Sequence, residues 1–154
     1  MNKELKIISY TGMILCLLGL IDSIYLTIAH YTTPVILACP ESKFINCAKV
    51  TTSPYSVIHG IPVAMLGLVF FVFMGILQLP HFWKSKNKNI HKIRLLFSVI
   101  GIFTIFYLVY IELYKLKAIC LYCTAAHILT FLIFVITIIG YSLLDKNQET
   151  NKSA

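Results

Sequence analysis

Charged side chains are scarce in this chain. Only 12% of its 154 residues are Asp, Glu, Lys or Arg, whereas 58% are hydrophobic, and the mean hydropathy is +0.84. A soluble domain carries about 25% charged residues. Half that fraction leaves too little polar surface to cover a globule. The composition therefore excludes a soluble globular protein and predicts an integral membrane protein.

Apolar runs long enough to cross a bilayer, which takes about 20 residues, occur four times. They cover residues 7–30, 61–79, 93–114 and 120–144. We therefore expect an all-α integral membrane protein, a four-transmembrane-helix bundle that forms one domain over residues 1–154. The first run follows a basic start, as in a signal peptide. It is too long for a signal-peptide core and no A-x-A-like cleavage pattern follows it, so we expect a permanent span.

Basic residues are concentrated on one side of these spans. Nine of the 13 lie before the first span, around the loop 80–92 or after the last span: Lys3, Lys6, Lys84, Lys86, Lys88, Lys92, Arg94, Lys146 and Lys152. Lys and Arg favour cytoplasmic loops. The pattern predicts a multi-pass protein of the cell (inner) membrane with both termini and the loop 80–92 in the cytoplasm and the loop 31–60 outside. Basic residues in short loops favour contact with the anionic lipid bilayer, and we expect no nucleic-acid partner.

Four cysteines fall on the predicted outer side. Cys39 and Cys47 lie in the outer loop, and Cys120 and Cys123 form a C-x-x-C at the start of the last span. Disulfides persist outside the cytoplasm, and the start of a helix lowers the pKa of a thiol. Two neighbouring pairs can exchange a disulfide through thiolate attack. The pattern predicts a thiol–disulfide relay, whereas Cys16, inside the first span, is interpreted as a small buried hydrophobe.

Two other interpretations of these cysteines remain open. The C-x-x-C is also half of a tetrahedral zinc site, which the loop pair or His127 would complete, but Cys39 and Cys47 lack the tight spacing of structural zinc ligands. We expect no bound metal. Alternatively, both pairs are structural disulfides, although a Cys120–Cys123 bond closes so small a loop that it adds little stability.

The outer loop also contains a predicted helix start. Ser53 resembles an N-cap, and Pro54 suits the first helical position. We expect a short helix over Ser53–His59 on the membrane surface. Gly60 would end this helix, with His59 as its cap.

Three ionisable residues fall inside or near the spans. His127 lies four residues after Cys123, on the same helical face, where it can donate a hydrogen bond to a ring carbonyl or pack within the bundle. Asp22 lies deeper in its span, and such residues face the protein interior. Glu112 lies near the outer end of the third span, where we expect it to reach water.

The order of these residues resembles the vitamin K epoxide reductase family. The resemblance covers about residues 10–143 and rests on Cys39 and Cys47, on Ser53-Pro-Tyr-Ser, on Gly60-Ile-Pro-Val-Ala-Met-Leu-Gly67 and on Cys120-Leu-Tyr-Cys123. Bacterial and archaeal members oxidise an extracytoplasmic or periplasmic thioredoxin-like protein and reduce a membrane quinone. Some carry a fused thioredoxin-like domain; none is recognised here, so the resemblance implies a separate DsbA-type partner.

The resemblance also implies a role for each cysteine. Cys123 corresponds to the thiol that meets the quinone, and Cys120 to its resolving partner. Cys47 corresponds to the loop cysteine that exchanges with Cys120, and Cys39 to the one that meets the substrate protein. The implied activity is quinone-dependent thiol oxidation in support of disulfide-bond formation.

Two further residues are implied at the quinone site. Ser53 matches the family's serine near the active pair. Vertebrate members carry a tyrosine four residues after the last cysteine, where this chain has His127. The resemblance therefore implies ubiquinone or menaquinone as the electron acceptor rather than vitamin K epoxide.

Two alternative functions compete with this one. DsbB-type oxidases also have four spans and two cysteine pairs, but their C-x-x-C lies in the first outer loop, whereas here the order is reversed. In a different class, the chain would be a non-enzymatic metal-binding or transport protein whose outer cysteines are ligands.

Overall fold

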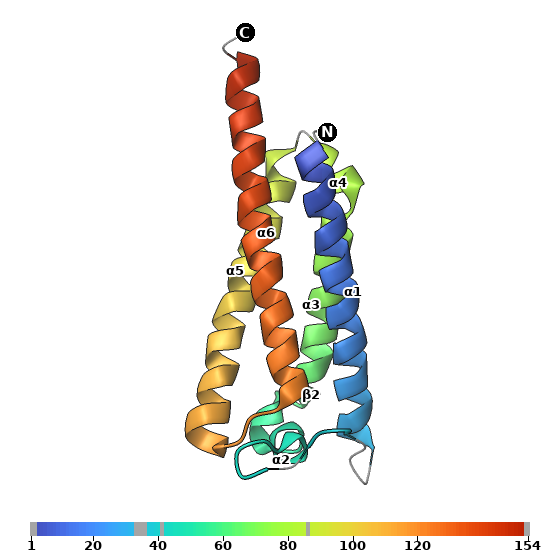
Figure 1. Ribbon diagram of the computed structural model, residues 1–154, viewed down its shortest axis with the longest axis vertical. Helices are drawn as coiled ribbons and strands as arrows, with labels where there is room; N and C mark the ends of the chain where they lie inside the picture. Colours follow the sequence, from blue (N-terminus) through green and yellow to red (C-terminus); the bar gives the residue numbers. More distant parts are fainter. Residues whose placement is uncertain (1–2, 33–36, 41, 86, 153–154) are drawn as a thin grey trace.

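Among the described residues, four main helices run along the long axis of the molecule (Figure 1). The computed structural model describes residues 3–32, 37–40, 42–85 and 87–152. The main helices are α1 (Lys3–Tyr31), α3 (Val63–Gln78), α5 (Lys88–Tyr110) and α6 (Leu121–Lys152), and α5 continues into a π-helix, η2 (Ile111–Leu116). Lys86, one of the nine basic residues counted above, lies outside the described residues.

Short elements connect the main helices. The segment before α3 holds α2 (Cys47–Thr51), the 3₁₀-helix η1 (Pro54–Ser56) and a hairpin of β1 (Val57–Ile58) and β2 (Ile61–Pro62), and α4 (Pro80–Lys84) follows α3. The two strands pair antiparallel. Both termini lie at one end of the molecule, and α2 and the hairpin lie at the other (Figure 1).

The hairpin replaces most of the surface helix expected over Ser53–His59, so that expectation is wrong. Only Pro54–Ser56 is helical. His59 and Gly60 form the turn between the strands, with φ of 50° and 83°. Positive φ at both central residues is the geometry of a type I′ turn, which two-residue hairpins prefer, and the β-branched residues on either side favour strands. His59 is therefore a turn residue and caps no helix.

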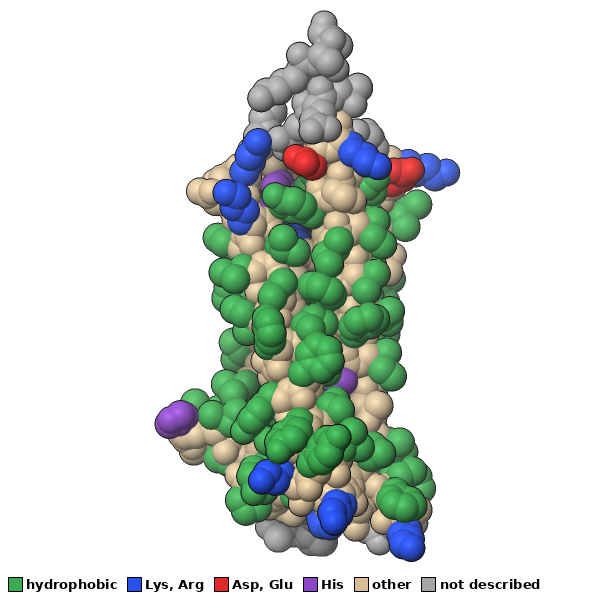
Figure 2. Space-filling view, turned by 90° about the vertical axis from the view of Figure 1, so that its left-hand side faces the viewer, with side chains coloured by type: hydrophobic (Ala, Val, Ile, Leu, Met, Phe, Trp, Pro, Cys, Tyr) green, Lys and Arg blue, Asp and Glu red, His purple; other side chains and the backbone are tan. Residues whose placement is uncertain are grey.

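The surface of the bundle is that of a membrane protein. Three helical segments, 3–31, 88–116 and 121–146, are long and apolar enough to cross a bilayer. The fourth, α3, is apolar but has only 16 residues. Hydrophobic side chains cover the middle of the face in Figure 2, and Lys and Arg are confined to its two ends. The expectation of an α-helical, multi-pass membrane protein is confirmed.

The core of the bundle lies between α1, α3 and α6. Cys16, Phe71, Met74 and Ile133 belong to one cluster and are each at most 2% exposed. Phe71 packs against α1 at Gly19, where a Cβ would overlap with the phenyl ring. The interpretation of Cys16 as a small buried hydrophobe is therefore confirmed.

A buried polar cluster holds the end of α3 near the chain termini. Arg94 of α5 donates two hydrogen bonds to the carbonyl oxygen of Leu77, at 3.0 Å from Nε and 2.7 Å from Nη2, and its guanidinium carbon lies 3.7 Å from the ring centroid of Trp83. Gln78 donates to Thr137 Oγ1 of α6 (3.2 Å) and accepts from Trp83 Nε1 (3.0 Å). These contacts satisfy polar groups at the helix end inside the protein. Arg94, which the sequence places beside the loop, is only 1% exposed.

Candidate functional site

The loop cysteines lie at the end of the molecule opposite the termini. Cys39 and Cys47 are joined by a disulfide, with their Cα atoms 6.1 Å apart. Cys47 is 1% exposed, whereas Cys39 is half-buried. Asn46 caps α2 by accepting a hydrogen bond from the Lys49 N–H at its Oδ1 (2.8 Å), which fixes Cys47 as the first helical residue. The loop pair thus presents one accessible sulfur and one buried sulfur.

The second pair lies where α6 begins. Cys120 is fully buried and stands immediately before the helix, and its Sγ accepts a hydrogen bond from the Cys123 N–H at 3.2 Å. This is the arrangement of an N-cap, with a thiol in place of the usual hydroxyl or carboxylate. The Sγ of Cys123 lies 2.6 Å from that of Cys120 and donates a hydrogen to it. Both sulfurs of this pair are free thiols.

The contact with the Cys123 thiol shifts the acidity of the Cys120 thiol. The pKa of its thiol is lowered, chiefly because the Cys123 thiol donates a hydrogen bond to the sulfur. The N–H groups of Cys123 and Tyr122 lower this pKa further, whereas burial and the nearby Glu112 carboxylate raise it. A thiolate is the nucleophile in disulfide exchange, so Cys120 is the sulfur of this pair that is prepared for it.

Main-chain hydrogen bonds align the two pairs. The N–H of Ile119 donates to the carbonyl of Phe44 (2.8 Å), and the N–H of Asn46 donates to the carbonyl of Ile119 (3.1 Å). The loop and the chain entering α6 therefore run in parallel. Cys47 follows directly on one side of this pairing and Cys120 on the other. Both belong to one buried cluster with Leu26, Val50 and Ala118, against which Cys39 and Cys123 also pack.

Tyr122, inside the C-x-x-C, holds the other end of the loop. Its hydroxyl donates to the carbonyl of Ala38 (2.9 Å), directly before Cys39. Its ring lies 4.9 Å from that of Tyr25, whose hydroxyl accepts from the Ala38 N–H (3.1 Å). The residue before Cys39 is thus fixed to both α1 and α6.

A cavity of about 640 Å³ lies beside Cys123, between α1, α3, α5 and α6. Its walls are mainly apolar and include the rings of Tyr55, Phe70, Phe71, Phe73 and Phe97. Of the four cysteines at this end, Cys123 alone lines it. A ligand in the cavity would therefore meet Cys123 and not Cys120.

The polar residues expected near the quinone also line this cavity. Ser53 is 7% exposed, and its hydroxyl donates to the carbonyl of Val50 (2.9 Å). His127 lies one helical turn beyond Cys123, and Ser23 and Thr130 add hydroxyl groups. The cavity therefore combines an apolar interior with a few hydrogen-bonding groups, as small-molecule sites do.

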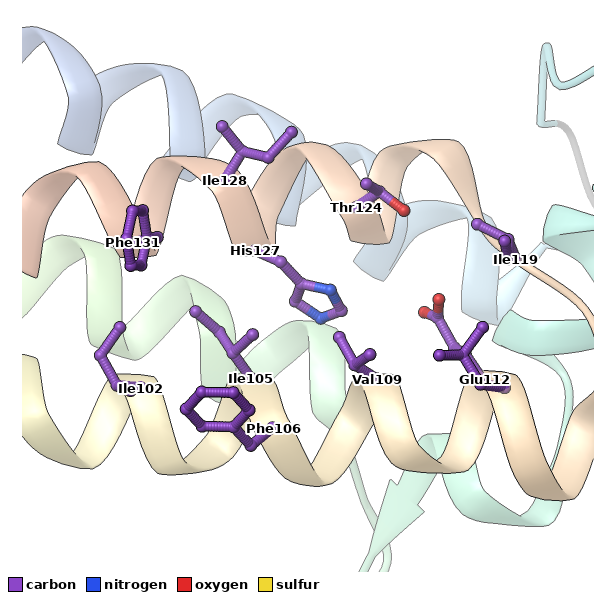
Figure 3. Close-up of a pocket in the computed structure, with 11 residues that line it drawn as sticks. Ile102, Ile105, Phe106, Val109, Glu112, Ile119, Thr124, His127, Ile128 and Phe131 are labelled. Carbon is purple, nitrogen blue, oxygen red and sulfur yellow. The ribbon is translucent and has the colours of Figure 1, made fainter.

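A second pocket, of about 450 Å³, lies between α5 and α6 (Figure 3). Apolar side chains dominate its lining, and its polar residues are Glu112, Thr124 and His127. In Figure 3 the His127 ring and the Glu112 carboxylate project from facing helices into the space between them. Glu112, His127 and Ile105 line both the cavity and this pocket, so they form the wall between the two.

The sequence led us to expect that Glu112 reaches water, and this expectation is wrong. Glu112 is 6% exposed because it belongs to the π-helix that ends α5 and faces the start of α6. Its carboxylate lies against the backbone N–H of Cys120, and its main-chain carbonyl accepts the N–H of Ala118 at 3.1 Å. An ionisable residue inside a membrane span is by itself a signal of function, and that signal would have identified Glu112.

Asp22 faces the same region from α1. One of its carboxylate oxygens is buried and has no hydrogen-bond partner among the described residues. It lies one turn before Tyr25, and its charge acts on Cys123. The prediction that Asp22 faces the protein interior agrees with this position.

The metal-binding alternative requires several ligands at one place. Within the described part of the chain, no group of three or more His, Cys, Asp and Glu side chains is arranged to hold a metal ion. The disulfide also removes Cys39 and Cys47 as ligands, because metal binding requires thiolates.

Comparison with known proteins agrees with the site. No curated protein matches the chain. The model of the vitamin K epoxide reductase family matches residues 11–138, a segment that holds both cysteine pairs, Ser53 and His127. The match extends over most of the sequence, and the chain therefore belongs to the vitamin K epoxide reductase family.

Proposed function

We propose that this protein is a membrane thiol:quinone oxidoreductase. It oxidises a thioredoxin-like (DsbA-type) protein outside the cytoplasm and passes the electrons through two cysteine pairs to a membrane quinone, which supports disulfide-bond formation. The observation that carries the proposal is the shared buried cluster of Cys47 and Cys120, with Cys123 at the wall of an apolar cavity.

The proposed topology has four spans. Here α3 crosses the membrane beside the three longer helices, the termini are cytoplasmic, and the loop 31–60 lies outside. The separation of termini and cysteines to opposite ends of the bundle supports this orientation, as does the bias of basic residues toward the end with the termini.

The relay begins at the loop pair. A thiolate of the partner attacks Cys39, the more accessible sulfur, and releases Cys47; the partner's second thiol then resolves the mixed disulfide, which leaves the loop pair reduced. Cys47 next attacks Cys120 of the inner disulfide and releases Cys123. Attack of Cys39 on Cys47 completes the transfer. Two electrons have then moved inward, the loop pair is a disulfide and the inner pair is a dithiol, which is the redox distribution in the structure.

The cavity suits a quinone headgroup. Its volume lies within the range of about 300–1,000 Å³ that is typical of small-molecule sites, and its aromatic walls match a flat apolar ring. A bound quinone supplies the acceptor of two electrons and two protons. Cys123 meets the ring and His127 donates a hydrogen bond to a ring carbonyl, while Ser53 can do the same when its hydroxyl turns from the Val50 carbonyl to the ligand.

Purified protein tests the proposal directly. A reduced thioredoxin-like protein should reduce a water-soluble ubiquinone or menaquinone analogue in the presence of this protein. The absorbance of the quinone measures the rate, which should increase with the concentration of the protein. Cys123→Ser should abolish the rate, because no other sulfur lines the cavity. Quinone reduction that survives Cys123→Ser would refute the proposal.

A further inference from the structure

We infer that Glu112 holds the proton that Cys120 releases and returns it to the quinone when the inner pair is oxidised. The inference rests on the proposed thiol:quinone reaction and adds to it the source of the second proton. It starts from the position of a buried carboxylate between the inner dithiol and two cavities.

Glu112 and Cys120 are in direct contact. The carboxylate lies against the backbone N–H of Cys120, and its charge acts on both thiols of the inner pair. The site is dry, since Glu112 is 6% exposed and Cys120 is fully buried. Two acids in such a site do not both ionise, because their like charges repel at low dielectric. A thiolate at Cys120 therefore requires a protonated Glu112.

With Glu112 as the proton carrier, the protons and electrons of quinone reduction balance. Cys120 transfers its proton to the Glu112 carboxylate and becomes a thiolate. When Cys120 and Cys123 form their disulfide, two electrons leave through Cys123 to the quinone. The two protons of the quinol come from the Cys123 thiol and from the Glu112 carboxylic acid, which returns to a carboxylate. Since Glu112 lines the cavity, its proton has a direct path to a ligand there.

Few other groups near this carboxylate can take the same role. The ionisable groups that line the cavity with Glu112 are His30 of α1, Tyr55 of η1, and Cys123 and His127 of α6. Outside this lining, Cys120 lies against Glu112, and Asp22 of α1 acts on Cys123 through its charge. The neighbouring Lys115 and Lys117 are exposed to solvent. None of the described α3 residues that line the cavity has an ionisable side chain. Asp22 is the one other carboxylate among these groups, which makes it the matched control.

A structural role is the competing explanation, because the Glu112 main chain also terminates the π-helix. Glu112→Gln separates the two. The amide oxygen still accepts from the Cys120 N–H, so a structural role survives, whereas the exchangeable proton is lost.

Redox-difference infrared spectroscopy of the full chain reads the proton directly. With the cysteines oxidised and reduced chemically, the wild type should show the C=O band of a protonated carboxyl group in the reduced state only. Asp22→Asn should keep this band and Glu112→Gln should lose it. A band that is absent from the wild type, that survives Glu112→Gln, or that disappears in Asp22→Asn would overturn the inference.

Turnover gives the second readout. Glu112→Gln should lower quinone reduction with dithiothreitol by on the order of 100-fold, the size of a general-acid contribution, and Glu112→Asp should recover part of it. Equal rates for Glu112→Gln and the wild type would overturn the inference. Because the infrared experiment contains no quinone, a redox-linked band in a protein that reduces no quinone would refute the proposed function and leave the proton site in place.

Discussion

The hydroxyl of Tyr122 offers a sharp test of how the loop pair is docked onto the inner pair. Tyr122→Phe removes the hydroxyl that donates to the Ala38 carbonyl (2.9 Å) and that is also hydrogen-bonded with the Tyr25 side chain, and it keeps the ring against Tyr25. A hydrogen bond such as that to Ala38 contributes about 0.5–1.5 kcal/mol, which corresponds to a factor of roughly 2 to 13 in the docked population. Because Ala38 is exposed, water replaces the lost donor. We therefore expect the docked population to fall by about twofold to fourfold, the low end of this range.

The assay compares two reductants. Quinone reduction driven by a reduced thioredoxin-like protein should fall by this factor, because in the proposed relay its electrons pass from Cys47 to Cys120. Reduction driven by dithiothreitol should not change, because a small dithiol reaches the inner pair directly. Tyr141→Phe, on the same helix near the other end, is the matched control and should leave both rates unchanged. An equal loss with both reductants, or no loss with the protein, would refute the docking role of Tyr122.

Three further predictions concern the cysteines. In intact cells treated with a permeant reductant, a membrane-impermeant maleimide should label Cys39, and labelling only after lysis would contradict the proposed orientation. The double variant Cys39→Ser/Cys123→Ser should accumulate a Cys47–Cys120 disulfide, because neither side keeps a resolving thiol; proteolysis in the loop 80–92 should then leave two fragments joined until reductant is added, and fragments that separate without it would exclude direct exchange. The lowered pKa of Cys120 implies that its alkylation, measured by mass spectrometry, persists below the pH range of an ordinary thiol and falls only as the pH drops through that lowered pKa. Cys123→Ala, which removes the S–H donor, should move the fall to higher pH, and an unchanged profile would contradict the stated cause of the shift.

Much of the helical framework could be predicted from hydrophobicity alone. The long apolar runs correspond to the main helices, because a bilayer leaves the backbone few other ways to satisfy its polar groups. The observed helix boundaries differ from the expected span boundaries by a few residues. For example, α5 begins at Lys88, within the loop expected over 80–92. Lysine side chains at a span end reach the interface while their backbone stays helical.

The site was less predictable, because it depends on contacts between distant segments. The order of the cysteines, Ser53 and the Gly60–Gly67 segment resembles the family that the comparison then showed, but nothing local in the sequence indicates that Phe44 and Asn46 pair with Ile119. The burial of Glu112 follows from the π-helix and from that pairing, neither of which has a sequence signature. The hairpin did carry a local signal, His59-Gly60 between β-branched residues, but the prediction of a helix rested on the serine–proline start alone.

The shortness of α3 has a consequence for the lipid around the protein. Sixteen residues at 1.5 Å each give a helix of about 24 Å, whereas the hydrocarbon layer is about 30 Å thick. The hairpin that precedes α3 exposes Ile58 and Ile61, which lengthens the apolar surface on one side, and the Arg94–Trp83–Gln78 cluster draws the polar end of α3 inward on the other. In the proposed four-span topology, the membrane beside α3 should therefore be thinner than beside α1 or α6. Such a mismatch makes the activity of a reconstituted protein depend on acyl-chain length, and short-chain lipids should favour the position of α3 that forms part of the cavity beside Cys123.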